Sequence, residues 1–356
     1  MKIIFVLLLA LVASHATAAE PSFYLGGDIS SLSELEKFGA VYRDNAKPGD
    51  CITILHDHGC NLFRLRLFVN PDHDFDKNYG ATQDLPMVLT LAKRIKKSGA
   101  KFSLAIHYSD TWADPGKQFK PDAWKDLPPG GLEQKVTDYT AGVMAAMKAN
   151  GTMPDIVEVG NETTNGMLWP DGKLDGKTPE EKDRKWDRYA ALLEAGVRGV
   201  RSQFTADRAR VLIHIDSGGK RGIPSWFFGE LKKRNADFDI IGLSFYPIWN
   251  DSLNALKQNM TELSPMGKDI LIIETAYPQK PMKQTPQTTW PMTPAGQKQF
   301  LDELISTVKA APGHRGIGVV WWYPEAVPIA HHKVWNGGAL GWFDGQGDLL
   351  PAMNQR

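Results

Sequence analysis

Two glutamates, each at the end of an apolar run, are the residues in this sequence whose types and positions could do chemistry together. Glu162 follows the run 156–159 and comes directly after Asn161, and Glu274 ends the run 270–273. Short apolar runs bounded by Gly or polar residues predict buried strands, so each carboxyl is expected where a strand opens into a loop. A single Glu there could equally cap a helix or pair with a surface Lys. Two such residues are typical of the carboxyl pair of a glycosidase.

The elements that must position these carboxyls alternate along the chain of 356 residues. Eight β-rich runs are predicted at Phe23–Asp28, Asn61–Phe68, Lys101–His107, Asp155–Glu162, Arg210–Asp216, Asp239–Tyr246, Asp269–Glu274 and Gly316–Trp322. Helical patterns lie between them at Leu85–Ser98, Leu132–Asn150, Pro179–Gln203, Ser225–Arg234, Ser252–Leu263 and Pro294–Ala310. This alternation predicts an α/β protein, a (β/α)8 TIM barrel, and the lack of a linker predicts one domain.

Other polar residues accumulate at the same ends of the predicted strands, where such barrels keep their active sites. Asp28 ends the first strand, Arg64 and Arg66 lie two apart on one face of the second, and His107 ends the third. An Arg within an apolar strand is costly unless it is paired, so we expect both to meet carboxylates. A structural ion pair at the barrel floor is the alternative for each.

The remaining candidate binding residues are an amide, a phenol and aromatic rings. Asn161 and Tyr246 are expected to orient the substrate and the nucleophile. The last strand closes with Trp321-Trp322-Tyr323, which is expected to form an aromatic floor under a sugar ring. Further candidates in the loops after the strands are Trp112, Asp114, Trp169, Trp249 and Trp335. Because the sequence has 11 Trp and many will be core, aromatic content alone is a weak indication.

Charge and motif content exclude several classes of function. The net charge is zero, from 41 basic and 41 acidic residues, which disfavours nucleic acid and anionic membranes as partners and fits an uncharged one. His107 and the pair 331–332 lack the spaced partners of a zinc site, so no metal is expected. No phosphate-binding Gly-rich motif and no Gly-x-Ser-x-Gly motif follows a strand, so no cofactor is expected.

The amino terminus and the two cysteines bear on the cellular compartment. Residues 1–19 combine a positive start, a short apolar run and a small-residue cleavage site, which predicts a signal peptide and a secreted or periplasmic protein without a membrane anchor. A buried amino-terminal strand is the alternative. Cys51 and Cys60 would lie a helix length apart, too far for a disulfide, so both are expected as buried free thiols.

Several longer motifs resemble one known family. They are Gly26-Gly27-Asp28-Ile29-Ser30-Ser31, Phe63-Arg64-Leu65-Arg66, His107-Tyr108-Ser109-Asp110 with Trp112-Ala113-Asp114-Pro115-Gly116-Lys117, Val159-Gly160-Asn161-Glu162-Thr163 with Gly166-Met167-Leu168-Trp169-Pro170, and Ile273-Glu274-Thr275-Ala276-Tyr277. Together they are similar to glycoside hydrolase family 53, over nearly all of residues 20–356, the expected catalytic domain. Asn-Glu alone would indicate only the wider clan of retaining barrel glycosidases.

The resemblance implies an endo-β-1,4-galactanase that cuts the galactan side chains of pectin. It further implies a retaining mechanism with Glu162 as acid/base and Glu274 as nucleophile, the latter kept charged by Arg66 with Tyr246 as hydrogen-bond donor. Bacterial members often carry calcium in the loop after strand seven, but residues 278–293 contain no Asp or Glu, so no site is expected there. We expect a monomer. Another retaining β-glycanase, such as a mannanase, and a non-catalytic glycan-binding relative are the alternatives.

Overall fold

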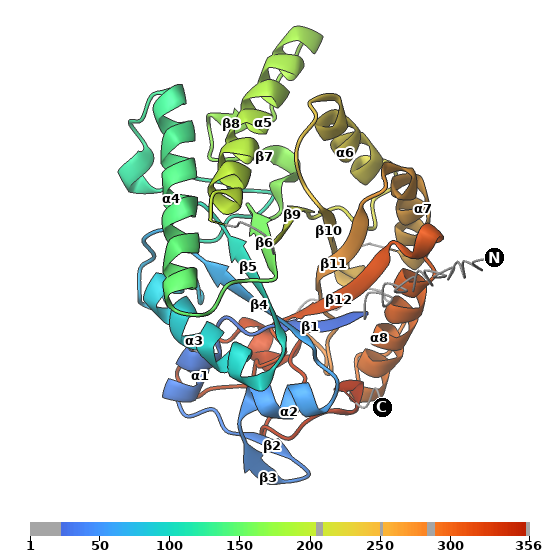
Figure 1. Cartoon of the computed structure of the whole chain (residues 1–356). Helices are drawn as coiled ribbons and strands as arrows, with labels where there is room; N and C mark the ends of the chain where they lie inside the picture. The colour runs from blue at the N-terminus through green and yellow to red at the C-terminus, as the bar shows by residue number, and fades with distance from the viewer. Residues whose placement is uncertain (1–22, 204–208, 250–251, 283–288, 354–356) are drawn as a thin grey trace, which may run out of the picture.

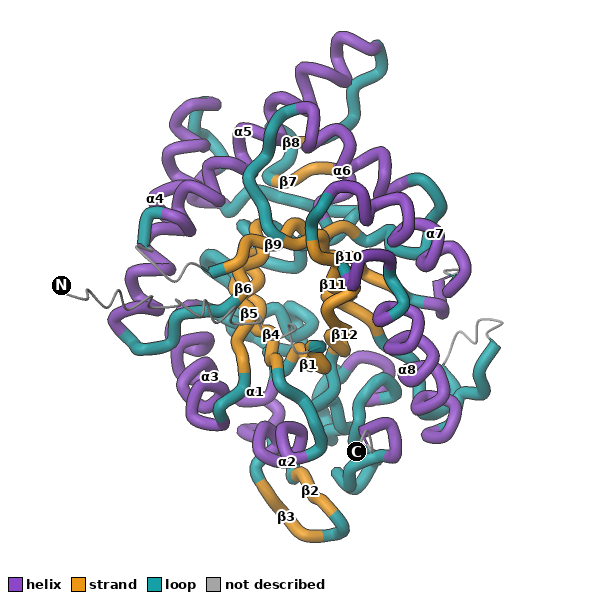
Figure 2. The backbone as a smooth tube through the Cα atoms, turned by 45° about the vertical axis from the view of Figure 1, so that its right-hand side comes forward, coloured by secondary structure: helices purple, strands orange, loops and turns teal. Residues whose placement is uncertain are grey.

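The computed structural model describes residues 23–203, 209–249, 252–282 and 289–353 (Figure 1). The predicted signal peptide, residues 1–19, lies outside this part of the chain. One α/β unit is formed, with the strands gathered at its centre and the long helices arranged around them (Figure 2).

Eight parallel strands close into a barrel in the order β1-β12-β11-β10-β9-β6-β5-β4, which confirms the predicted TIM barrel. They are β1 (Tyr24–Asp28), β4 (Leu62–Leu67), β5 (Lys101–Ile106), β6 (Ile156–Val159), β9 (Arg210–Ile215), β10 (Ile240–Phe245), β11 (Asp269–Thr275) and β12 (Gly316–Trp322). Each corresponds to one of the predicted strands, within a few residues at the ends.

Helices follow the strands because their apolar faces cover the outside of the barrel. The longer ones are α3 (Leu85–Ser98), α4 (Pro129–Ala149), α5 (Pro179–Arg201), α6 (Ile223–Lys233), α7 (Leu253–Leu263) and α8 (Pro294–Lys309), and all six were predicted. The shorter elements are α1 (Leu32–Lys37), α2 (Cys51–Asp57) and two small hairpins, β2 (Tyr42–Asp44) with β3 (Lys47–Gly49), and β7 (Gly166–Met167) with β8 (Gly172–Lys173). Local capping fixes the boundaries: Asp84 accepts from the Met87 N–H at the start of α3, and Gly99, with φ of 86°, ends it.

The interior of the barrel changes from apolar to polar along the strands. Leu62, Ile156 and Leu212 belong to one buried apolar cluster on three different strands. Because side chains alternate with a period of two, the next residues on that face are Arg64, Glu158 and His214. The polar residues therefore form a layer above an apolar floor, toward the carboxyl ends of the strands.

An extra residue in β11 aims the second glutamate inward. The register runs from Leu243 opposite Ile272 directly to Ser244 opposite Glu274, so β11 carries one unmatched residue relative to β10. Such a bulge turns the following side chain to the other face of the sheet. Glu274 consequently projects toward the barrel mouth.

Both cysteines are buried and free, as predicted. Cys51 begins α2 and Cys60 precedes β4, and each has 0% of its surface exposed. Burial raises the pKa of both thiols well above the ordinary value.

Candidate active site

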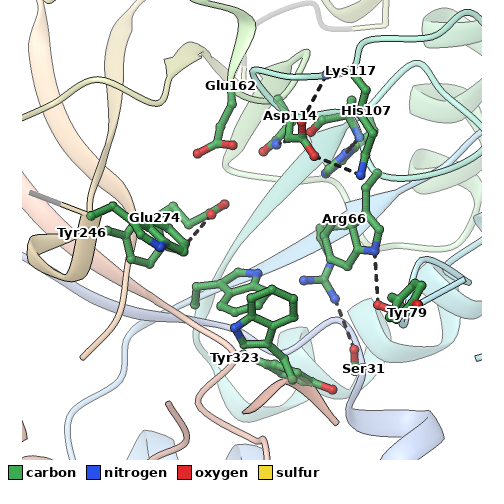
Figure 3. Close-up of a pocket in the computed structure, with 16 residues that line it drawn as sticks. Ser31, Arg66, Tyr79, His107, Asp114, Lys117, Glu162, Tyr246, Glu274 and Tyr323 are labelled. Carbon is green, nitrogen blue, oxygen red and sulfur yellow. Dashed lines mark hydrogen bonds and ion pairs between the residues drawn. The ribbon is translucent and has the colours of Figure 1, made fainter. Parts of the chain in front are cut away.

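A cavity of about 420 Å³ opens at the carboxyl ends of the barrel strands, and both glutamates line it (Figure 3). Many of the residues predicted for the site line this cavity: Arg66, His107, Trp112, Asp114, Asn161, Glu162, Tyr246, Trp249, Glu274 and Trp335. The two carboxyls thus come together from β6 and β11, as the strand-end positions predicted.

Glu162 lies in a tight turn that follows β6. Gly160 has φ of 80°, and a Cβ there would lie 2.7 Å from a methyl group of Thr163. Glu162 itself has a left-handed φ of 46°, a conformation that costs energy for a residue with a side chain. Burial raises the pKa of Glu162 well above its usual range, and the nearby Glu274 raises it further. A protonated carboxyl near neutrality is the state that a general acid requires.

Glu274 has a different set of neighbours. Arg64 donates from Nη1 to its Oε2 at 3.1 Å, and the Tyr246 hydroxyl donates to its Oε1 at 2.8 Å. Both donors favour the ionised form of a carboxyl that they contact. The expected hydrogen bond from Tyr246 to Glu274 is thus present, and the two glutamates have different hydrogen-bond partners.

Arg64, rather than Arg66, is the guanidinium that contacts Glu274, which corrects the prediction. Fully buried, it pairs with Asp28 at 2.7 Å and Glu158 at 2.8 Å, and it donates to Asn161 Oδ1 at 2.7 Å. A guanidinium has five donors, so it satisfies several acceptors at once.

Arg66 lies one strand repeat nearer the cavity. Its guanidinium stacks on the Trp112 ring, 4.5 Å from the centroid, and donates to Ser31 Oγ at 3.2 Å (Figure 3). Its contact with Asp28, at 3.7 Å, is the longer of that carboxylate's two ion pairs. Arg66 therefore lines the cavity, whereas Arg64 makes the contact with Glu274.

Asp28 does not line the cavity, contrary to the prediction that it binds substrate. Its side chain is 1% exposed and is occupied by Arg64 and by the hydroxyl of Ser30, which donates at 2.6 Å. Asp28 does end the first strand, as predicted, but its oxygens are used within the barrel.

His107 lines the cavity, and its ring nitrogens have different surroundings. Its Nδ1 accepts from the Ala113 N–H at 3.4 Å, and its Nε2 is buried without a partner among the described residues. Burial lowers the pKa of His107 well below its ordinary value, and Arg64 lowers it further. The ring is thus neutral, and because Nδ1 accepts, Nε2 carries the proton.

Aromatic rings surround the opening, with two corrections to the predicted set. Trp249 and Trp335, 55% and 48% exposed, line the cavity, but Trp169 packs beneath the Lys173 ammonium outside it. Trp321 is fully buried and its Nε1 donates to the Leu340 carbonyl at 2.8 Å. The other two residues of the expected aromatic floor, Trp322 and Tyr323, line the cavity instead. Four further lining residues were not predicted to bind substrate: Ser31, Tyr79, Ala113 and Lys117.

No group of three or more His, Cys, Asp or Glu side chains that could hold a metal occurs in the part of the chain that the structure describes. His332 Nδ1 lies 3.0 Å from Asp76 Oδ2, within hydrogen-bond distance, and the His332 ring stacks on Phe38. Residues 283–288 of the loop predicted to lack calcium lie outside the described part, so that expectation stays a prediction.

In this closed (β/α)8 barrel, two strand-end glutamates meet in one aromatic cavity. The pKa of Glu162 is raised, and Glu274 accepts from Arg64 and Tyr246. These features define a glycoside hydrolase. The family model for glycosyl hydrolase family 53 matches residues 24–355. The chain belongs to glycosyl hydrolase family 53, which confirms the resemblance.

Individual relatives agree with this assignment. The chain is 34% identical to the arabinogalactan endo-beta-1,4-galactanase of Cellvibrio japonicus, over 98% of this chain and 94% of that one. Among solved structures, the GH53 catalytic domain of Ignisphaera aggregans superposes with a TM-score of 0.83 at 27% identity, covering 94% of this chain and 95% of that one. A fungal beta-1,4-galactanase superposes with a TM-score of 0.81 at 28% identity, covering 93% and 98%.

Proposed function

We propose that this enzyme hydrolyses internal β-1,4-galactosidic bonds of galactan, including the side chains of type I arabinogalactan, with retention of anomeric configuration. Membership of family 53 and the names of its relatives support the substrate. The observation that carries the mechanism is the contrast between the two carboxyls: burial raises the pKa of Glu162, whereas Arg64 and Tyr246 donate to Glu274.

In the first step Glu274 attacks the anomeric carbon and the bond to the leaving sugar breaks. Glu162 transfers its proton to the departing oxygen, so that the leaving group is a neutral alcohol. A covalent galactosyl ester on Glu274 results. The negative charge of the nucleophile is consumed in this step, and Glu162 becomes the anion.

In the second step water attacks the ester. Glu162, now a carboxylate, removes a proton from the water while the bond to Glu274 breaks, which restores both groups. Loss of the charge on Glu274 in the intermediate removes the repulsion that raises the Glu162 pKa, and this favours its role as base. The neutral His107 and the Arg66 guanidinium supply donors to sugar hydroxyls.

The arrangement of aromatic rings fits a bent polymer. Galactan units are joined through the axial 4-hydroxyl, so the chain curves and needs stacking faces at changing angles. Trp112, Trp249, Trp322 and Trp335 lie around the opening from loops or strand ends on different sides of the barrel. The zero net charge also suits an uncharged polysaccharide.

Product stereochemistry tests the mechanism. Proton NMR of a fresh digest should show the β-anomer first. Glu162→Ala, supplied with azide and an activated aryl galactobioside, should give a β-galactosyl azide, and Glu274→Ala should give the α-azide. The α-azide from Glu162→Ala and the β-azide from Glu274→Ala would contradict the proposed roles of acid/base and nucleophile.

A second experiment tests the substrate. Unbranched β-1,4-galactan should lose viscosity faster than reducing ends appear, whereas mannan, xylan and polygalacturonate should be cut little. Equal rates on mannan and galactan would favour the mannanase-like alternative. Tight galactan binding without turnover would favour the non-catalytic alternative.

We also propose that residues 1–19 direct secretion and are removed, that a monomer is the active form, and that nucleic acid is not a partner. The sequence pattern supports the signal, and no helix in the described residues is long and apolar enough to cross a membrane. The mass of the protein recovered from the culture medium or periplasm should correspond to cleavage near Ala19. A secreted protein that retained its first residues would contradict this part.

A further inference from the structure

A buried hydrogen-bonded chain connects the acid/base to the centre of the barrel. Ser244 Oγ lies 2.7 Å from Glu162 Oε1 and 2.8 Å from His214 Nε2, within hydrogen-bond distance of both. On the other side of the ring, His214 Nδ1 lies 2.7 Å from Glu158 Oε1. Glu158, His214 and Ser244, here called the His214 relay, each have 0% of their surface exposed.

Glu158 fixes the direction of the first bond. Burial alone would raise its pKa, but the charges of Arg64 and His214 outweigh burial and lower the pKa to about 2. Arg64 donates to both carboxylate oxygens, at 3.0 and 2.8 Å. A carboxylate only accepts, so the His214 Nδ1 must carry a proton.

The hydrogen bond between His214 Nε2 and Ser244 Oγ has two possible directions, because the Ser244 hydroxyl has only one proton to donate. If His214 Nε2 is bare, Ser244 donates to it, and Glu162 has to point its own proton at Ser244 through Oε1. If Nε2 also carries a proton, Ser244 accepts from His214 and donates to Glu162 Oε1. Only the second arrangement leaves the acidic proton of Glu162 on Oε2, free for the leaving group.

We propose that His214 and Ser244 are positioning residues for the acid/base, and that a doubly protonated His214 reserves the second oxygen of Glu162 for proton transfer. This inference rests on the proposed acid/base role of Glu162. The charged and titratable groups around the ring are compatible with it: Glu158 and Glu162 face His214 from β6 and the turn after it, while Arg64 and the neutral His107 lie on β4 and at the end of β5.

The relay also links the two steps of the reaction. When Glu162 has given its proton away, the Ser244 hydroxyl still donates to the resulting anion, which lowers the pKa of Glu162. Turning the Ser244 hydroxyl around would remove that stabilisation and point its proton at the N–H of His214 Nε2, which is also a donor. His214 thus holds the same bond through the acid step and the base step.

Ser244→Ala tests the inference when two substrates are compared. On galactan, whose leaving group needs a proton, kcat/KM should fall at least about tenfold, which is part of the roughly 100- to 10,000-fold that general acid catalysis contributes. On a dinitrophenyl galactobioside, whose leaving group needs none, kcat/KM should change less than about threefold. The alkaline limb of the galactan profile should move to higher pH, because the bond that lowers the Glu162 pKa is lost.

Ser103→Ala is the matched control. Ser103 lies on β5, also 0% exposed, and its hydroxyl has no partner among the described residues. The same atom is removed from the barrel wall without breaking a hydrogen bond, so both substrates and the pH profile should be unaffected.

A second pair of variants keeps the test decisive if Ser244→Ala does not fold. His214→Gln can still donate an amide N–H toward Ser244, whereas His214→Leu cannot, so Gln should retain at least about tenfold more activity on galactan than Leu. Equal losses on both substrates in Ser244→Ala, or equal activity of the Gln and Leu variants, would overturn the inference.

Failure of the proposed function is distinguishable from failure of the inference. Glu162→Gln should itself lose far more activity on galactan than on the dinitrophenyl substrate. If Glu162→Gln shows that contrast and Ser244→Ala does not, only the positioning role is wrong. If Glu162→Gln shows no contrast, the acid/base assignment fails first.

Discussion

Glu158→Gln removes the carboxylate that joins Arg64 to His214 beneath the active site, and its effect on stability should depend on pH in a defined way. In the folded protein the pKa of Glu158 is lowered from 4.5 to about 2. A group whose folded pKa is depressed stabilises the protein above its unfolded pKa, and this contribution is lost as pH falls through the folded pKa. The contribution should be fully present near pH 7.

The magnitude follows from that shift. At about 1.4 kcal/mol per pKa unit, ionisation of Glu158 contributes roughly 3 kcal/mol to the free energy of unfolding at pH 7. The same linkage leaves somewhat less than half of this contribution at pH 3. The stability difference between the wild type and Glu158→Gln should therefore shrink by about half between pH 7 and pH 3.

Equilibrium urea unfolding at several pH values, followed by tryptophan fluorescence, measures this difference. Glu303→Gln, on the exposed side of α8 where the carboxylate accepts from Gln299, is the control and should change stability little at any pH. A Glu158→Gln penalty that stayed constant from pH 7 to pH 3 would refute the reasoning, because the carboxylate would then contribute through shape or packing rather than through its ionisation.

Three further changes have defined outcomes. Tyr246→Phe removes the donor to Glu274, and kcat on galactan should fall about 100-fold with the fold intact by circular dichroism; an unchanged kcat would contradict the contact. Trp335→Ala removes a ring that is 48% exposed at the cavity, so KM for galactan should rise severalfold; a change in thermal stability alone would make the residue structural. Glu325 is fully buried and its pKa is raised well above 4.5, so it weakens the fold as pH rises above 4.5, and Glu325→Gln should gain stability over the wild type from pH 4 to pH 7 in urea titrations. A gain that declined over this range would reverse the sign of the argument.

The barrel and the meeting of two glutamates in one cavity could be predicted because both depend on local patterns. Apolar runs with β-branched residues specify the strands, and Glu162 and Glu274 are the strand-end carboxyls that follow two of them. Trp321 was assigned to the wrong face, although alternation from Val320, which belongs to the inner apolar cluster, would have turned the next residue outward and Trp322 inward.

The depth of each side chain within the barrel was not predictable from one strand alone. Arg64 and Arg66 share a face and differ only in height, and which one meets Glu274 depends on the stagger of β4 against β11 across the barrel. His214 gave a weak signal, a lone histidine in an aliphatic strand, because its partners come from β6 and β10 and only closure of the barrel brings them together.

The ion pairs of Arg64 make the fold and the catalytic charge inseparable. This one guanidinium, on β4, holds Asp28 of β1, Glu158 of β6 and Glu274 of β11, so its partners come from both halves of the chain. If β4 separated from the elements that carry these three carboxylates, a buried charge would be left unpaired, which costs several kcal/mol. A partly unfolded sample should consequently contain folded molecules with full activity and unfolded molecules with none, and no folded form of intermediate activity.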